Sequence, residues 1–226
     1  MNNVGENFGN SLASNELKIF SRLNTPQKIQ DYLDNLPINF ETNGETYMSP
    51  RRVIREKKAH CFEGALLAAA ALFYHGAKPL LLDLQTVGGD EDHVVALFGD
   101  QSSGRGLWGA ISKTNHSILR YRDPVYKTIR ELAMSYFHEY MMDNGKKTLR
   151  KFSKPFDLSG FPSEKWVTAE EDLHWLVEAL DSSPHFPVAP KNVLRRLRKA
   201  SIVEVKAVNV VEWPIPNSLK INKHDL

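Results

Sequence analysis

The most apolar stretch of the chain runs from Ala65 to Tyr74, ten residues without a charged side chain. It follows the CFEG sequence that begins at Cys61, and it ends at Gly76, a residue type that is common just past a helix. A helix that is apolar on all sides must be buried on nearly all of them, so we expect it to form the centre of a folded domain. The run is well short of the ~20 residues that cross a bilayer, and no membrane partner is expected.

Three strand-like runs follow this helix, at residues 79–87, 93–98 and 106–112. The segments between them are rich in glycine and in acidic or small polar residues, which is typical of turns. Loops of this length suit antiparallel pairing of neighbouring strands. The pattern therefore predicts a small antiparallel sheet that packs against the buried helix.

Amphipathic patterns predict additional helices on both sides of this core. They lie at residues 14–23, 25–36, 127–142, 168–182 and 190–200. Thr25-Pro26 is a start signal for the second, and the spacing of Thr168 and Glu171 suits a capping box for the fourth. Residues 37–58 are expected to be irregular and residues 115–124 to form a loop. The alternating segment from Ser201 to Trp213 predicts a final strand.

The order of these elements indicates an α+β fold, in which helices cover a small antiparallel sheet. The 226 residues suit one domain or one domain with an appendage. We expect residues 1–24 to be an N-terminal segment that is partly flexible and residues 25–145 to be the core. Residues 146–226 are expected to be a C-terminal helical extension with a closing strand, packed on the same domain.

Composition excludes several classes of protein. The 42% apolar and 25% charged fractions are ordinary for a globular chain, and 29 basic residues nearly balance 27 acidic ones. This balance gives no reason to expect nucleic acid as a partner, and the basic stretches at 51–58 and 195–199 are interpreted as solvated faces. The first stretch leads into Cys61 and could line the mouth of a site. Residues 1–16 lack the pattern of a secretory signal, so a cytoplasmic protein is expected.

Cys61 is the single cysteine of the chain, so neither an intrachain disulfide nor a thiolate metal cage is expected, and no metal or organic cofactor is implied. It stands at the start of the buried helix, where unpaired N–H groups and the helix dipole favour a thiolate and can bind an oxyanion. His93 opens the second predicted strand and can supply the base that a thiol nucleophile needs. The alternative is that Cys61 is an inert core thiol.

The residues that carry a resemblance to a known family are Cys61-Phe62-Glu63-Gly64-Ala65, the Ala/Leu helix that ends at Gly76, the PLLLDL run from Pro79, the strand from His93 to Phe98, and Leu107-Trp108. This pattern covers residues 52–117, about a third of the chain, and resembles the core of the transglutaminase-like superfamily. The resemblance implies a papain-like α+β fold and acyl-transfer chemistry, with Cys61 as nucleophile and His93 as base. The implied substrate is a peptide, a protein or a small amide, and the acyl group passes to water or to an amine.

The match with the family breaks at the third site residue. The family usually places an Asp on the next strand, shortly after a Trp, where this chain has Ser112. Asn115 lies three residues further on and has better chemistry, because its amide oxygen can accept from an imidazole N–H. Ser112 and Asn115 are therefore alternatives for the third member. Since neither is an acid, the chain could also be a catalytically silent relative that serves as a binding or scaffold module.

Other polar residues near this pattern are given lesser roles. His60 precedes Cys61, but adjacent helical residues point about 100° apart, so it is interpreted as a flank rather than the base. His116 is a weaker alternative for the base. Residues 90–92 are acidic but lack the spacing of a calcium loop, and they are interpreted as a solvated turn.

Overall fold

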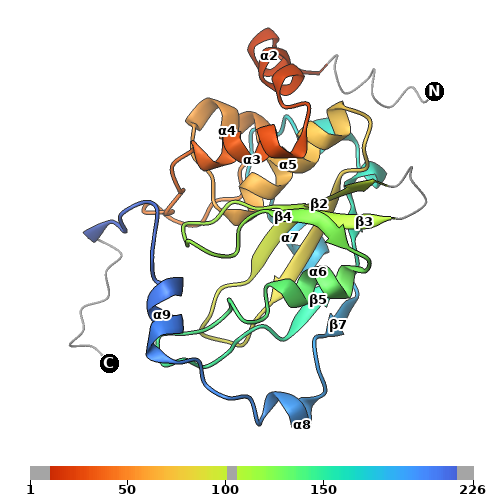
Figure 1. Cartoon of the computed structure of the whole chain (residues 1–226). Coiled ribbons are helices and arrows are strands. Elements are labelled where there is room, and N and C mark those ends of the chain that lie inside the picture. The colour runs from red at the N-terminus through yellow and green to blue at the C-terminus, as the bar shows by residue number, and fades with distance from the viewer. Residues whose placement is uncertain (1–10, 101–105, 218–226) are drawn as a thin grey trace.

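Helices and antiparallel strands are mixed along the chain in the computed structural model, which describes residues 11–100 and 106–217 (Figure 1). The α-helices in these ranges are α2 (Ser14–Arg22), α3 (Pro26–Asp34), α4 (Pro50–Glu56), α5 (Cys61–Tyr74), α6 (Ile129–Ser135), α7 (His174–Asp181), α8 (Lys191–Leu194) and α9 (Ile202–Val208). The strands are β1 (Leu80–Gln85), β2 (His93–Asp100), β3 (Leu107–Ile111), β4 (Arg122–Tyr126), β5 (Lys151–Ser153), β6 (Phe156–Asp157) and β7 (His185–Pro187). The predicted α+β class is confirmed. None of the helices in the described ranges has the length and apolarity needed to span a membrane.

The strands form one sheet in the order β4-β3-β2-β1-β5-β7, and β6 pairs with the other end of β1. All the pairs are antiparallel. The three predicted strands are confirmed as the neighbours β1, β2 and β3. Sequence analysis missed β4, β5, β6 and β7, which are short or half-exposed, so the sheet is wider than expected.

Helix α5 packs on one face of this sheet against β1 and β2, and α3 and α4 cover its other sides (Figure 1). Because side chains alternate across a strand, Leu81 and Ala96 join α5 in one apolar cluster, whereas Leu82 and Leu97 join a second cluster with α6. The sheet is therefore covered on both faces. This burial explains why α5 is apolar all round and why β1 has few polar residues.

Two boundaries in the helical regions differ from the predictions. The segment 37–58 is not irregular throughout, because α4 begins at Pro50 with the hydroxyl of Ser49 accepting from the N–H of Arg52 at 3.3 Å. The Ser-Pro pair was a start signal that sequence analysis overlooked. Conversely, the helix predicted from residue 168 begins only at His174, as α7. The hydroxyl of Thr168 donates to the carbonyl of Glu164 and does not cap a helix.

The predicted closing strand at 201–213 is wrong, because this segment contains α9. The backbone N–H of Ser201 donates to the Glu204 carboxylate at 2.6 Å, which caps the helix. Ile202 and Val203 are 77% and 72% exposed, so the alternation of β-branched residues matches no buried sheet face. The predicted helices at 127–142 and 190–200 are present as the shorter α6 and α8.

The N-terminal segment was expected to be partly flexible, and its first ten residues lie outside the described ranges. Its remaining part forms α2, which an ion pair ties to α4. The Nε of Arg51 lies 2.7 Å from the carboxylate of Glu16, which is almost fully buried. This part of the segment is therefore attached to the core.

Candidate functional site

Cys61 is the first residue of α5, and its side chain is partly exposed. The preceding residue, His60, has extended backbone angles of φ −95° and ψ −172°, so the chain enters the helix abruptly at this point. The Sγ atom lies 4.0 Å from the carbonyl oxygen of Asp92, just before β2. The start of α5 and the start of β2 therefore meet, as predicted from the sequence.

His93, the first residue of β2, is 5% exposed and pairs with Leu84 of β1. Its imidazole lowers the pKa of the Cys61 thiol through hydrogen bonding and through its charge. The structure thus brings the two predicted site residues together. Since β2 packs directly on α5, this contact is built into the framework of the fold and does not depend on a surface loop.

Ser112, just after β3, is a polar neighbour of His93. Its Oγ lies 2.7 Å from Nε2 of His93 and 2.6 Å from the carbonyl oxygen of Leu119. The hydroxyl has one proton, which it donates to the Leu119 carbonyl, so its oxygen accepts from the Nε2–H of His93. This assigns the proton of the neutral imidazole to Nε2, so Nδ1 is the ring nitrogen that can accept a proton.

Asn115, the other alternative for the third member, is occupied elsewhere. Its Oδ1 accepts from the backbone N–H of Trp213 at 2.8 Å, and its Nδ2 donates to the carbonyl of the same residue at 3.0 Å. His116, the weaker alternative for the base, bonds to the carbonyl of Val208 at 2.9 Å. Both residues hold the C-terminal segment, and the geometry selects Ser112 as the partner of His93.

His60 has a larger part than the sequence suggested, because its imidazole lowers the pKa of the Cys61 thiol. The argument from helical spacing fails because His60 is the N-cap residue and its backbone is extended, not helical. Its Nε2 lies 2.9 Å from the carbonyl oxygen of Thr46 and 3.4 Å from a carboxylate oxygen of Glu63. Burial lowers the pKa of His60, but the hydrogen bond and charge of Cys61 and the charge of Glu63 outweigh it and raise the pKa to about 9.

The pKa of the Cys61 thiol is lowered well below its ordinary value. Burial alone would raise it, but hydrogen bonds and charges from His60 and His93 more than compensate. The thiolate therefore lies between two imidazoles, one supported by a carboxylate and the other by a hydroxyl. Two imidazoles thus favour the ionised form of the Cys61 thiol, against the effect of burial.

Glu63 is a site residue that sequence analysis missed. Its carboxylate is fully buried and accepts hydrogen bonds from the side chains of Asn39 and Thr46 and from the backbone N–H groups of Met48 and His60, at 3.0–3.2 Å. A buried carboxylate needs such partners. It is the one charged residue of α5 and stands three residues after the N-cap, which is a signal that could have identified it.

Gln30 of α3 was also missed, and it holds Ser112 in place. Its Oε1 accepts from the backbone N–H of Ser112 at 3.0 Å, and its Nε2 donates to the carbonyl of Ser112 at 2.8 Å. Both residues are buried. The sequence feature that could have identified Gln30 is its position next to Ile29 and three residues before Leu33, both on the apolar face of α3.

Lys113, which follows Ser112, is fully buried and fastens the same segment to α3. Its Nζ donates to the carbonyl oxygens of Leu33, at 2.8 Å, and Leu36, and burial lowers its pKa to about 8. A Cβ atom added to Gly64 would overlap the Cβ of Lys113. Gly64 of the CFEGA sequence is therefore required by the close approach of this lysine.

Leu119 carries the carbonyl that receives the Ser112 hydroxyl, and its backbone is left-handed, with φ 61°. Its N–H donates to the carboxylate of Glu139 at 2.8 Å, and this carboxylate forms an ion pair with Arg122 of β4. The guanidinium of Arg122 also lies 4.1 Å from the ring centroid of Tyr136. A conformation that non-glycine residues rarely adopt is thus held in place from both sides.

The acidic residues 90–92 form the turn beside the thiol. Asp92 accepts hydrogen bonds from the backbone N–H and the hydroxyl of Thr86, at 2.7 and 3.0 Å. The pKa of Glu91 is raised by partial loss of hydration and by the charge of Cys61. Among the described residues, no group of three or more His, Cys, Asp or Glu side chains is arranged to hold a metal ion.

Comparison with known proteins adds no assignment to this geometry. No family model matches the chain, and no curated protein matches it either. The resemblance to the transglutaminase-like superfamily therefore rests on the sequence pattern alone. The function must be argued from the contacts of Cys61, His60, His93 and Ser112.

Proposed function

We propose that this chain is a cysteine enzyme of transglutaminase-like type, with a papain-like arrangement of its core, that acts on an amide or acyl group of a peptide, a protein or a small amide. The observation that carries the proposal is the Cys61 thiol at the start of α5, whose pKa two imidazoles lower well below its ordinary value. A thiolate at neutral pH is the form that attacks an acyl carbon.

In this mechanism the thiol proton moves to Nδ1 of His93 and the sulfur of Cys61 forms a bond to the carbonyl carbon. The charge on His60 stabilises the thiolate while the proton moves. The oxyanion that results would be held by backbone N–H groups in the first turn of α5, where the helix offers unpaired donors. The helical hydrogen bonds of α5 begin at Gly64, whose backbone N–H donates to the carbonyl of His60.

The imidazolium of His93 then protonates the leaving amine as the carbon–nitrogen bond breaks, which leaves an acyl group on Cys61. Water or an amine attacks this thioester, gives its proton to His93 and releases the thiolate. Ser112 keeps the Nε2 proton of His93 in place, so that Nδ1 is the atom that exchanges protons. The carboxylate of Glu63 lies beside His60, whereas the polar partner of His93 is the hydroxyl of Ser112.

The alternative from another class is a silent relative that serves as a binding or scaffold module. That reading requires a thiol with an ordinary pKa and no contact with His93. A partly exposed Cys61 with two imidazole partners and a lowered pKa favours the enzyme. Ser112 stands where the usual acid would contact His93, and the charge of His60 adds to the stabilisation of the thiolate.

The test is the pH dependence of Cys61 alkylation by iodoacetamide in wild type, His93→Ala and His60→Ala. The lone cysteine makes the signal unambiguous. We expect a wild-type thiol that titrates well below the ordinary ~8.5 and a higher pKa in each variant. A screen of amides and amine acceptors would follow. A thiol that titrates near ~8.5 in all three proteins would refute the enzyme and leave the scaffold module.

A further inference from the structure

A basic cleft of about 480 Å³ lies between two segments that are far apart in the sequence. Lys146, Lys147 and Arg150 line it from the segment before β5, and Lys191, Arg195 and Arg198 line it from α8 and the residues that follow. Seven of its ten lining residues are Lys or Arg, and none is acidic. Sequence analysis interpreted the stretch at 195–199 as a solvated face, and the structure adds a second basic wall opposite it.

These cations are poorly compensated by the protein itself. Within residues 11–100 and 106–217, the nearest ion pair of the cleft is a loose one of 3.8 Å between Arg198 and Glu204. The guanidinium of Arg150 donates to two backbone carbonyls, and burial lowers its pKa. Lys146 and Arg195 are exposed and have no carboxylate partner in those ranges. Like charges that converge on one hollow repel one another, and a bound anion would relieve that repulsion.

We propose that this cleft binds a small ligand that carries a chain of two or three phosphates. Arginine and lysine are the side chains that recognise phosphate, and several cations around one hollow match several negative charges in sequence. The volume lies within the ~300–1,000 Å³ of small-molecule sites. Val87, Leu194 and Leu197 give the cleft an apolar side that can accept the uncharged part of such a ligand.

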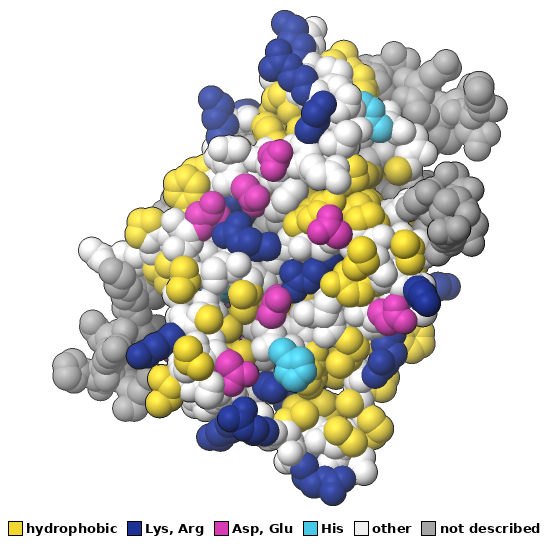
Figure 2. Space-filling view, viewed as in Figure 1, with side chains coloured by type: hydrophobic (Ala, Val, Ile, Leu, Met, Phe, Trp, Pro, Cys, Tyr) yellow, Lys and Arg dark blue, Asp and Glu magenta, His cyan; other side chains and the backbone are white. Residues whose placement is uncertain are grey.

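A nucleic acid fits the cleft less well than a small polyphosphate. Single-stranded nucleic acid is held by aromatic side chains on which bases stack, and the lining contains no aromatic residue. The cations also converge on one hollow instead of following a track across the surface. In Figure 2, dark blue side chains lie at the lower end of the molecule, where Figure 1 places α8.

The cleft and the candidate site share no residue, so binding of a ligand in the cleft can be measured without enzymatic turnover. Val87 follows β1, and its N–H donates to the carbonyl of Thr148 at 3.1 Å. The turn that begins there ends at Asp92, beside Cys61. None of the lining residues belongs to the proposed catalytic group. The proposal therefore stands or falls independently of the proposed enzyme.

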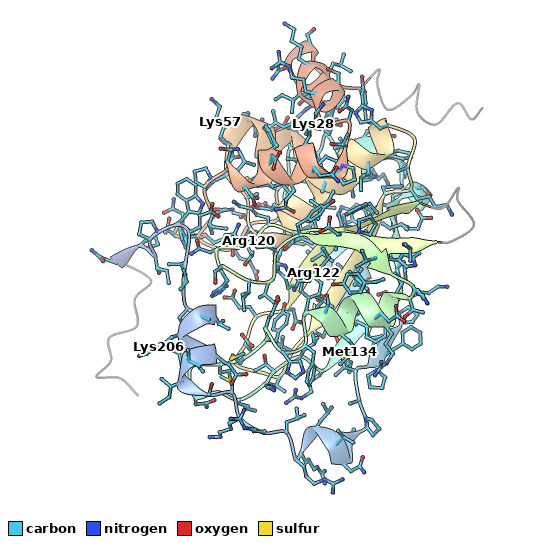
Figure 3. The ribbon with its side chains drawn as sticks, in the orientation of Figure 1. Lys28, Lys57, Arg120, Arg122, Met134 and Lys206 are labelled. Carbon is cyan, nitrogen blue, oxygen red and sulfur yellow. The ribbon has the colours of Figure 1, made fainter. Side chains whose placement is uncertain are left out.

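The experiment is isothermal titration of the full chain with inorganic triphosphate, with orthophosphate and a single-stranded DNA oligonucleotide as comparison ligands. The cleft variant is the double substitution Lys146→Gln/Arg195→Gln, which changes two exposed residues. The matched control is Lys18→Gln/Lys28→Gln, on α2 and α3; Lys28 lies at the opposite end of the molecule from α8 (Figure 3). Both variants remove two positive charges, so they change the net charge equally.

We expect wild type and control to bind triphosphate saturably at one site and more tightly than orthophosphate. The cleft variant should bind triphosphate about tenfold or more weakly, since removal of a single charge-assisted hydrogen bond already weakens binding by about that factor. Equal losses of triphosphate affinity in the cleft variant and the control would show that net charge alone causes the effect, and would overturn the proposal. Absence of triphosphate binding, or tighter binding of the oligonucleotide with a steep salt dependence, would also overturn it.

Discussion

The substitution Gln30→Leu tests whether α3 sets the position of the His93 partner. Leucine keeps the size and burial of the side chain but removes both hydrogen bonds to the backbone of Ser112. It would leave a buried N–H and a buried carbonyl without partners at the point where Ser112 meets His93. We therefore expect two effects, one on stability and one on the thiol.

The expected loss of stability is about 2–6 kcal/mol, because each of the two buried polar groups that lose their partner costs about 1–3 kcal/mol. Natural domains have about 5–15 kcal/mol in total, so the variant should fold with a reduced urea midpoint. The effect on chemistry follows from displacement of Ser112, since an error of ~1 Å in a catalytic group can cost ~100-fold in rate. We expect the pKa of the Cys61 thiol to rise toward its ordinary value as His93 loses its orientation.

The assay measures urea unfolding and the pH dependence of Cys61 alkylation on the same preparations. The matched control is Gln27→Leu, the same change on an exposed position of α3. A second variant, Gln30→Glu, keeps an acceptor for the Ser112 N–H, but its buried carboxylate faces the Ser112 carbonyl and Asp34 in place of the donor, so it should also be destabilised. If Gln30→Leu or Gln30→Glu is destabilised but its thiol titrates as in wild type, Gln30 is structural only and the reasoning about His93 is refuted.

Three other substitutions probe contacts elsewhere in the fold and the site. Gly64→Ala should destabilise the chain by about 1–3 kcal/mol, because the methyl group meets Lys113, even though alanine favours helices by ~1 kcal/mol over glycine; a urea midpoint at or above that of wild type would contradict this. The Cys61–His60 pair should make wild type more stable than Cys61→Ser between about pH 6.5 and 8.5. This difference in unfolding free energy should be lost as the pH falls through the lowered thiol pKa, and also as it rises through about 9, the pKa of His60. A difference that does not change with pH would argue against the pair. The carboxylate of Asp83 lies 2.9 Å from Nε2 of His185, so His185→Ala would leave it buried without this partner and should cost about 3–5 kcal/mol of stability. In thermal melts, the double variant Asp83→Leu/His185→Leu should recover much of this loss.

The parts of the fold that local pattern controls could be predicted from the sequence. The apolarity of α5 identified the central helix, and the alternation of apolar runs and turns identified β1, β2 and β3. Because Cys61 starts this helix and His93 starts the strand packed on it, their proximity was also predictable. The alternating segment that forms α9 shows the limit of this approach. Its pattern suits a strand, but in the described residues it joins no strand of the sheet, and it pairs only through an isolated bridge between Val211 and His116.

The residues that complete the site depend on contacts between distant segments. Ser112 and Asn115 could not be separated from the sequence, because the choice depends on Trp213, which binds the Asn115 side chain. Gln30 lies on another helix, and nothing in the local pattern links it to Ser112. The part of His60 was missed because it follows from the extended backbone of an N-cap, which a rule for helical spacing does not describe.

The left-handed backbone of Leu119 has a consequence for how far the site could be moved to another protein. The region that resembles a family ends at residue 117, yet the Ser112 hydroxyl needs the carbonyl that Leu119 presents. The backbone N–H of Leu119 donates to Glu139, which is paired with Arg122, and Leu119 packs in the apolar cluster on the face of the sheet opposite α5. A graft of the motif segment alone would carry the nucleophile and the imidazoles but not the anchorage of their polar partner. The smallest transplantable unit of this site therefore includes both layers of the fold.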